Sequence, residues 1–414
     1  MKLKKQDKKI ASLINLETER QKTSLEMIPS ENHCSSAVRE ALGSLLTDKY
    51  AEGYPGKRYY SGLKYYDKLE TLCQERAKKL FKVVHANVQP YSGSPANAAV
   101  YMAICEPGET IMGMALPMGG HLSHGWKVNF SAKFFKSVQY GVDEKTHLID
   151  YPLVEKLAKE HKPKLIWAGA TAYPRIFNWK RLAQIADSIN AYLAADIAHI
   201  AGLIVGGAHP SPVPYVHLIT TTTHKTLRGP RGAIIMVTKK GVEKDPELPK
   251  KIDRAIFPGF QGGPHENSIA AIAVCLKEAA SPDFKKYARQ VVKNAKILAE
   301  ELKRYGFNLI SGGTDNHLLL IDLRNKNIMG AKAADLLEEA GITVNKNSVP
   351  YDTSGPFNPS GIRMGTPAIT TRGMKEKEMK KIAGWVNEVI SDSGKVKKIR
   401  IEVKKLCKKF PLPK

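Results

Sequence analysis

Short apolar runs alternate with amphipathic stretches between about residues 80 and 240, and this alternation constrains the fold more than any other feature. Residues 165–170 form an apolar run of strand length, and residues 181–189 follow with apolar side chains at helical spacing. Residues 191–195 form another strand-like run. Strands that alternate with helices build βαβ units and a mostly parallel sheet. We therefore predict an α/β fold with a large, mostly parallel sheet between helices.

A glycine-rich turn at residues 257–264 ends this region and leads into a long helical stretch. Apolar side chains recur at helical intervals across residues 284–302. Residues 318–323 and 361–364 then resemble strands of a smaller C-terminal α/β domain. A chain of 414 residues, 43% of them hydrophobic, can bury more than one core. The predicted parts are an N-terminal helical arm (1–48), a large cofactor-binding domain (49–280) and a small domain (281–414).

Lys225 follows four threonines and a histidine, and a glycine-rich segment comes after it. An amine in this setting, at the end of an apolar segment, suits a lysine that forms a Schiff base with an aldehyde. Such a lysine works best with a lowered pKa, which burial and the nearby cations Arg228, Arg231 or His224 can supply. The alternative is a solvated lysine in a polar loop, where lysines usually lie.

The strand-like run 191–195 leads into Asp196, and His199 lies three residues further on. Groups at the carboxyl ends of strands in an open α/β sheet face the ligand crevice. An aspartate there can pair with the protonated pyridine nitrogen of pyridoxal phosphate, which keeps this cofactor an electron sink. The alternative is a helix cap or a local hydrogen bond.

Ser92, Gly93 and Ser94 form a small polar turn that leads into alanine-rich, helix-forming sequence. Backbone N–H groups at a helix start, two hydroxyls and a glycine make an anion cradle. The alternative is an ordinary helix N-cap. A phosphate cradle, an acid and a lysine in this order are typical of one large class of pyridoxal phosphate enzymes.

Further blocks, in order along the chain, carry a closer resemblance. They are residues 28–32, 49–60, 119–122, 220–225, 259–264, 311–317, 344–350 and 361–367. From about Met27 to Gly373 the chain resembles serine hydroxymethyltransferase, a family of fold-type I pyridoxal phosphate-dependent transferases. The resemblance implies reversible transfer of the serine hydroxymethyl carbon to tetrahydrofolate, giving glycine and 5,10-methylenetetrahydrofolate. A side aldolase activity on β-hydroxy amino acids is also implied.

The same resemblance implies how the cofactor is held. Lys225 would carry pyridoxal phosphate as a Schiff base, Asp196 would pair with the ring nitrogen, and His121 would stack on the ring. Thr171 and His199 would lie near the phenolic oxygen. The phosphate would be held by Ser92, Gly93, Ser94, His224 and, from the partner subunit, Tyr50, Gly262 and Gly263.

Arg363 is expected to bind the substrate carboxylate, because a guanidinium fork fixes both oxygens, and Ser30 would assist. Glu52 lies among tyrosines that can hold a carboxyl group protonated, so it can exchange protons with the substrate hydroxyl and the folate nitrogens. The alternatives are a salt bridge for Arg363 and interface packing for the tyrosines. The expected catalytic residues are Lys225, Glu52, Tyr50, Tyr60 and His199, and the expected substrate-binding residues are Ser30, Glu52, Tyr60 and Arg363.

For the folate, the resemblance implies Tyr59, Leu116, Gly120, His121, Leu122, Asn347, Gly355, Pro356 and Phe357. Two departures from the family pattern fall here. Family members often carry an Ala-His pair before Gly-Gly, whereas this chain has Pro117-Met118, and Gly355 replaces a frequent serine. The identity of the pterin therefore stays open.

The remaining features restrict cofactors and location. The five cysteines are scattered without a C-x-x-C pair, and no acid or cysteine cluster joins His121 and His124, so we expect free thiols and no metal. No apolar run approaches the ~20 residues of a membrane span, and no signal-type core follows the basic start. We expect a cytoplasmic protein.

The formal charge is +24, and residues 1–10 and 391–414 hold 11 of these charges. We expect solvated surfaces rather than a nucleic-acid partner, because no nucleic-acid motif accompanies them. The resemblance implies serine, glycine and a reduced folate as partners. It also implies a homodimer with shared active sites, or a tetramer, in which the N-terminal helices pack on the partner. The rivals are a folate-independent aldolase and a basic RNA-binding protein that retains the scaffold.

Overall fold

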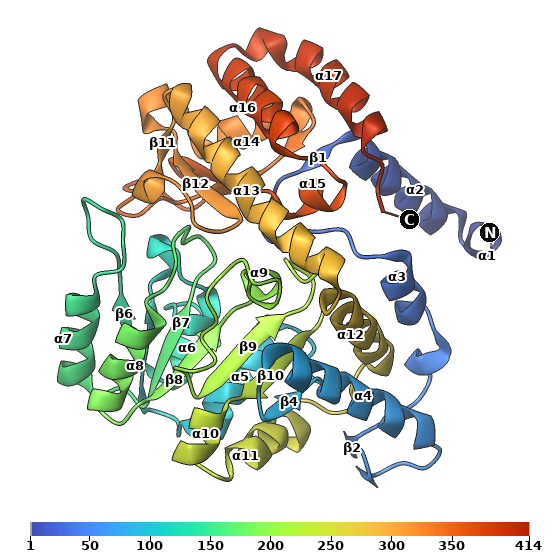
Figure 1. Ribbon diagram of the computed structural model, residues 1–414, viewed down its shortest axis with the longest axis vertical. Helices are drawn as coiled ribbons and strands as arrows, with labels where there is room; N and C mark the ends of the chain where they lie inside the picture. The colour runs from blue at the N-terminus through green and yellow to red at the C-terminus, as the bar shows by residue number, and fades with distance from the viewer. Residues whose placement is uncertain (1, 414) are drawn as a thin grey trace.

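The computed structural model describes residues 2–413; Met1 and Lys414, the outer ends of the first and third predicted parts, lie outside the described residues. Two main bodies of structure are joined by the long helix α13 (Pro282–Arg304), which crosses between them in Figure 1. The first half of α13 contributes Phe284 and Val291 to one hydrophobic core, and its second half contributes Leu298 and Leu302 to another. The apolar periodicity of this segment therefore predicted one helix that serves two cores.

The larger body is built on a seven-stranded sheet. In spatial order its strands are β4 (His85–Asn87), β10 (Ala233–Val237), β9 (Leu218–Thr222), β8 (Tyr192–Asp196), β7 (Leu165–Gly169), β5 (Thr110–Met114) and β6 (Lys136–Tyr140). Strands β6, β5, β7, β8 and β9 pair in parallel, and β10 runs antiparallel to both of its neighbours. The predicted α/β class with a mostly parallel sheet is confirmed.

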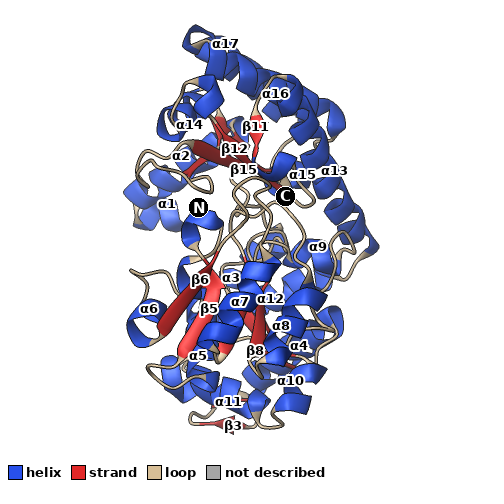
Figure 2. Cartoon of the chain, turned by 90° about the vertical axis from the view of Figure 1, so that its left-hand side faces the viewer, coloured by secondary structure: helices blue, strands red, loops and turns tan. Residues whose placement is uncertain are grey.

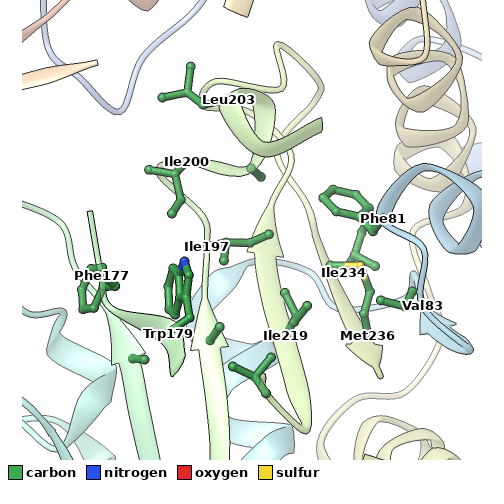
Figure 3. Close-up of a cluster of buried hydrophobic side chains, with 14 of the residues drawn as sticks. Phe81, Val83, Phe177, Trp179, Ile197, Ile200, Leu203, Ile219, Ile234 and Met236 are labelled. Atoms are coloured by element: carbon green, nitrogen blue, oxygen red, sulfur yellow. The ribbon is translucent and has the colours of Figure 1, made fainter. Parts of the chain in front are cut away.

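Helices cover both faces of this sheet, so its strands are apolar on both sides. Along β7, Leu165 and Trp167 belong to one core, and Ile166 and Ala168 belong to the core on the opposite face. Figure 3 shows part of that second core, in which Trp179 and Ile219 lie among its labelled side chains. The helices of this body are α4 (Lys64–Phe81), α5 (Gly93–Ile104), α6 (Phe130–Phe134), α7 (Tyr151–His161), α8 (Trp179–Ser188), α9 (Ala201–Val205), α10 (Lys239–Lys244), α11 (Leu248–Arg254) and α12 (Glu266–Ala279).

The smaller body contains a four-stranded antiparallel sheet. Its strands, in spatial order, are β11 (Asn308–Leu309), β12 (Leu318–Asp322), β15 (Gly361–Gly365) and β14 (Asn345–Asn347). Figure 2 shows this sheet beneath the helices at the upper end of the molecule. These helices include α14 (Gly330–Glu339), α16 (Glu376–Ser391) and α17 (Val396–Lys409), and the short α15 (Pro367–Thr371) follows β15. Leu320 of β12 lies opposite Arg363 of β15.

The N-terminal segment packs on the smaller body of its own chain. Strand β1 (Leu25–Glu26) pairs in parallel with β13 (Ile342–Thr343), and this places Leu25 and Met27 in the smaller core. Helix α2 (Lys8–Thr23) still leaves Leu13, Ile14 and Leu16 more than half exposed. The remaining α-helices and strands before α4 are α1 (Lys2–Gln6), α3 (Ser36–Leu42), β2 (Gly53–Tyr54) and β3 (Lys57–Arg58). Among residues 2–413, no helix combines the length and apolar character that a membrane crossing requires.

Candidate functional site

Lys225 lies in the loop directly after β9 and is only 8% exposed. Burial, opposed by the charge of Asp196 and helped by the positive charges of Arg363 and Arg231, lowers the pKa of its amine to about 8. Arg228 does not act as the sequence suggested. Its backbone has φ of 63°, and its guanidinium lies 4.4 Å from the ring centroid of Tyr287, so it serves in packing.

Asp196 ends β8, one strand away from the lysine loop, as its place after an apolar run predicted. Its Oδ2 atom accepts hydrogen bonds from Nδ2 of Asn97 at 3.0 Å and lies 3.1 Å from Nε2 of His124. Burial by itself would raise the pKa of Asp196. The hydrogen bond and charge of His124, together with His121 and Lys225, outweigh burial and hold this pKa below its usual value. The site thus keeps a buried, ionised carboxylate.

His121 and Thr171 approach from two turns that follow β5 and β7. Nδ1 of His121 lies 2.7 Å from Oγ of Ser123, and burial lowers the pKa of this histidine to about 4. Thr171 Oγ1 donates to the carbonyl of Gly120 at 2.8 Å. The flat, neutral imidazole of His121 is therefore held in one orientation close to Asp196, whose charge acts on it.

The predicted anion cradle lies at the start of α5. Ser92 is the N-cap, but its side chain makes no capping hydrogen bond. A Cβ atom on Gly93 would lie 2.9 Å from the Thr222 side chain, so this close approach of helix and strand needs glycine. Oγ1 of Thr222 and Nδ1 of His224 are both buried without a hydrogen-bond partner. An unpaired hydroxyl beside a helix N-terminus, with an unpaired imidazole nitrogen two residues further along the chain, fits an anion such as phosphate.

Arg363 lies in β15 of the smaller body and points toward the larger one. Its Nη1 donates to the carbonyl of Thr171, and its Nε donates to Oδ1 of Asn345 at 3.2 Å. Burial lowers its pKa to about 10, while the carboxylate of Glu31 acts in the opposite direction. A buried guanidinium without a bidentate carboxylate partner suits the binding of a carboxylate ligand.

Tyr50, Glu52 and Tyr60 form a separate group, in a loop apart from the residues that surround Lys225. None of them is among the groups that act on Lys225. Tyr50 and Tyr60 stack on each other at 5.4 Å and are 62% and 46% exposed. This loop packs on the turn of Gly262 and Gly263, because a Cβ atom on Gly262 would lie 3.2 Å from Oε1 of Glu52.

The predicted folate residues come from three places. Leu116, Gly120 and Leu122 lie in consecutive turns after β5, and Leu122 is 42% exposed. Asn347 ends β14, and Lys346 beside it donates to the carbonyl of Phe357 at 2.7 Å, so the 355–357 turn lies against this strand. Tyr59 lies elsewhere, with its ring 5.6 Å from Phe257.

Sequence reasoning missed several residues that hold the site. Asn97 and His124 hydrogen-bond Asp196, Asn32 donates to the Lys225 carbonyl at 3.0 Å, and His317 contacts His199. None of these contacts has a local sequence signal. The structure also brings ligand atoms of His121, His124 and Asp196 within 4.8 Å of one another, although the sequence showed no acid near this histidine pair. Because His124 hydrogen-bonds Asp196, we interpret these histidines as residues that fix the Asp196 carboxylate.

These residues fit pyridoxal phosphate by their chemistry. Lys225 offers a buried amine with a lowered pKa, Asp196 offers a charge for the ring nitrogen, and His121 offers a flat ring. The unpaired Thr222 hydroxyl beside the start of α5 and the unpaired Nδ1 of His224 are suited to a phosphate group.

Comparison with known proteins agrees with this chemistry. The family profile of serine hydroxymethyltransferase matches residues 3–386. A serine hydroxymethyltransferase of Acidothermus cellulolyticus (strain ATCC 43068 / DSM 8971 / 11B) is 53% identical over 416 aligned residues, which cover 98% of this chain and 96% of that protein. The chain belongs to the serine hydroxymethyltransferase family, whose members use pyridoxal phosphate and tetrahydrofolate.

Proposed function

We propose that the residues around Lys225 carry out the family's reaction, the reversible conversion of serine and tetrahydrofolate to glycine and methylenetetrahydrofolate. The main support is Lys225 itself. Its amine is buried and has a pKa of about 8, which the carboxylate of Asp196 raises and the guanidinium of Arg363 lowers. Near physiological pH the neutral fraction of this amine is therefore far larger than that of an ordinary lysine, whose pKa is 10.5, and this favours attack on an aldehyde.

Pyridoxal phosphate, when bound, supplies an electron sink for the bond that breaks at the amino-acid α-carbon. Asp196 keeps its negative charge toward the ring nitrogen, because His124 and Asn97 hydrogen-bond it. With the cofactor bound, His121 would cover one face of the ring, and Thr171 and His199 would lie toward the phenolic oxygen. The proposed phosphate contacts are Ser92, Gly93, Ser94, His224 and, from the partner subunit, Tyr50, Gly262 and Gly263.

Arg363 and Ser30 bind the substrate carboxylate and so orient the scissile bond. The support is the burial of Arg363, which is 9% exposed and fixed by Asn345 and Thr171 from two directions. A side chain held this way loses little conformational entropy when a carboxylate arrives.

Glu52 moves a proton on the substrate hydroxyl and the folate nitrogens, with Tyr50 and Tyr60 beside it, and it acts in the partner's site. The exposed tyrosines of this loop and the exposed apolar side chains of α2 support a homodimer, since such aromatic and apolar surface is commonly covered by a partner. A tetramer could assemble from such dimers. The three parts of the chain remain proposed as 1–48, 49–280 and 281–414, with the first part contacting the partner.

The folate lies between the turns after β5 and the β14 edge of the smaller sheet. Leu116, Gly120, His121 and Leu122 form one wall, and Asn347 with the turn of Gly355, Pro356 and Phe357 forms the other. Tyr59 joins from the partner subunit. Phe357 is 86% exposed, so a large apolar ring is available to stack on a flat pterin.

We place the reaction in the cytoplasm, because all five cysteines are free thiols.

Subunit mixing tests the shared site. Lys225→Ala and Glu52→Gln should each be inactive alone, since each lacks one essential group in every site. After the two variants are unfolded and refolded together, mixed dimers carry one site with both groups intact, so about a quarter of wild-type activity should return. Serine-dependent glycine formation with tetrahydrofolate is the measurement. If no activity returns although mixed dimers form, Glu52 serves its own subunit and the shared-site proposal is wrong.

A further inference from the structure

The side chain of Asn32 joins the Lys225 loop to α13 and to the smaller body. Its Nδ2 donates to the carbonyl of Lys225 at 3.0 Å and to the hydroxyl of Tyr287 at 2.8 Å. Its Oδ1 accepts from the hydroxyl of Thr371 at 2.7 Å and from the N–H of His33 at 2.9 Å. A carbonyl can only accept and a backbone N–H can only donate, so these partners fix the orientation of the amide. Both of its donors and both of its lone pairs are used.

The Lys225 carbonyl begins the turn that follows the lysine. It also accepts from the backbone N–H of Arg228 at 3.0 Å. Within this turn, Oγ1 of Thr226 donates to the carbonyl of His199 at 2.9 Å, which ties the turn to the larger body. Asn32 supplies the hydrogen bond that reaches the turn from the N-terminal segment. Because the carbonyl and the side chain of a residue share one Cα atom, a fixed carbonyl restricts the direction in which the Lys225 amine extends.

The segment that carries Asn32 is attached to the smaller body. The carbonyl of Met27, a residue of the smaller core, accepts from the N–H of Gly365 at 2.7 Å, and Gly365 ends the strand of Arg363. Thr371, which donates to Asn32, ends α15, and this helix follows that strand. Asn32 is therefore tied by two routes to the part of the chain that holds Arg363, and its Nδ2 extends this connection to the lysine loop.

We propose that Asn32 is a positioning residue, which holds the backbone of Lys225 at a fixed place relative to the body that carries Arg363. This inference rests on the function proposed above, in which Lys225 reacts with the cofactor aldehyde and Arg363 binds the substrate carboxylate. An amino acid carries its amine and its carboxylate on the same carbon. The substrate amine takes the place of the lysine amine while its carboxylate stays on the arginine, so the two side chains have to keep one spacing.

The alternative is that Asn32 only stabilises the fold, and Asn294 separates the two roles. Asn294 is a completely buried asparagine of α13. Its Nδ2 donates to Oγ1 of Thr370 at 2.8 Å and to the carbonyl of Met374 at 3.0 Å, so it too ties α13 to the smaller body. Among the described residues, none of its hydrogen-bond partners lies in the Lys225 loop. Asn294→Ala therefore removes a comparable set of hydrogen bonds without releasing the lysine.

The rate at which apoenzyme captures pyridoxal phosphate tests this role. In this step the Lys225 amine condenses with the aldehyde and releases one water molecule, and stopped-flow absorbance follows the change. The limiting rate at saturating cofactor is measured well above the Lys225 pKa of about 8, where the amine is neutral. Asn32→Ala should lower this rate roughly 10- to 100-fold, because a released backbone places the amine less accurately against the aldehyde. Asn294→Ala should keep the wild-type rate, although it lowers the melting temperature.

Two further variants isolate the parts of this network. Asn32→Asp keeps the size and the acceptor oxygens of residue 32, but its carboxylate cannot donate to the Lys225 carbonyl, so it should show the same loss of rate. Thr371→Val removes the link to the smaller body and should lower kcat/KM for serine. Asn32→Ala combined with Thr371→Val should lose no more kcat/KM than Asn32→Ala alone, because Thr371 acts through Asn32.

Capture rates in Asn32→Ala and Asn32→Asp that match wild type would overturn the inference. An equal loss of rate in Asn294→Ala would do so too, since it would show a general effect of stability, as would additive losses in the double variant. A failure of the proposed function is distinguishable from these results. If wild-type apoenzyme does not capture pyridoxal phosphate, Lys225 lacks its proposed role; if it does and the Asn32 variants match it, only the role of Asn32 is wrong.

Discussion

Nε2 of His124 lies 3.1 Å from Oδ2 of Asp196, and the His124 ring stacks on Trp167 with centroids 5.1 Å apart and planes 6° from parallel. The indole fixes the ring, and the ring fixes one carboxylate oxygen. Asn97 donates to the same oxygen, and the N–H of Ala198 donates to the other. A buried carboxylate with both oxygens hydrogen-bonded is oriented before the cofactor binds.

Asp196→Asn should lower kcat on the order of 100-fold, because the amide keeps the shape but loses the charge that we propose pairs with the ring nitrogen. Glycine formation from serine and tetrahydrofolate measures this, with cofactor content followed by absorbance. Asp187→Asn is the control, since Asp187 is 53% exposed on α8 and pairs with Lys240 at 2.7 Å. Near-normal kcat in Asp196→Asn with full cofactor content would contradict the assigned role.

The rate at which apoenzyme binds pyridoxal phosphate covalently should rise about tenfold per pH unit below pH 8 and level off above it, because only the neutral Lys225 amine attacks. Stopped-flow absorbance measures this rate. Arg231→Gln removes a cation that lowers this pKa, so its midpoint should move upward. A wild-type rate that keeps rising toward pH 10.5, the ordinary pKa of lysine, would exclude the lowered value.

The same shift has a consequence for stability. The folded apoenzyme releases the Lys225 proton at about pH 8, whereas the unfolded chain holds it to about pH 10.5. The folded state therefore bears the full cost of the buried charge below pH 8, and this cost disappears as the pH rises from 8 to 10.5. In Lys225→Met apoenzyme the pH dependence of melting temperature across this window should be weaker than in wild-type apoenzyme.

Arg363→Lys should raise the KM for serine roughly 10- to 100-fold, because an ammonium group cannot reproduce the two parallel hydrogen bonds of a guanidinium fork. Steady-state kinetics with varied serine measures this, and the KM for tetrahydrofolate should change far less. Arg324→Lys controls for the loss of an arginine, since Arg324 is 50% exposed and its Nη2 pairs with Oδ2 of Asp322 at 2.7 Å. An unchanged serine KM would show that Arg363 does not bind the substrate carboxylate.

The sequence predicted those parts of the site that depend on local pattern. An apolar run of strand length is enough to place Asp196 at the carboxyl end of β8, and helical spacing is enough to find α13. The contact of Asn97 with Asp196 also needs the position of α5 over the sheet, which no local spacing encodes. The pairing of β1 with β13 joins segments more than 300 residues apart and was missed for the same reason.

The prediction for Arg228 was wrong for a different physical reason. Three residues of separation from Lys225 suggested that its charge lowers the pKa of the amine. A backbone φ of 63° at Arg228 turns the side chain toward Phe284 and Tyr287 of α13, so burial, Arg363 and Arg231 lower that pKa instead. Side-chain direction in a loop depends on backbone angles that sequence spacing does not give.

Glu266 is a buried carboxyl group behind the loop of Glu52. Neither of its oxygens makes a hydrogen bond, and Arg58, whose Nη2 lies 3.6 Å from Oε1, pairs more closely with Glu70 at 2.6 Å. Burial, followed by the charge of Glu70, raises the pKa of Glu266 to about 8. In the unfolded chain the pKa is near 4.5, so this group's contribution to stability is lost as pH rises from about 4.5 through about 8.

Glu266→Gln replaces this carboxyl with a neutral group of the same shape, so the variant should not suffer that loss. Its melting temperature relative to wild type should therefore increase between about pH 5 and about pH 9, as followed by calorimetry. Glu243→Gln, at a glutamate that is 62% exposed, should show no such trend. Glu70→Gln should instead destabilise the protein, because it removes the closest partner of the buried Arg58. A difference between Glu266→Gln and wild type that is constant across this pH range would show that Glu266 does not titrate within it.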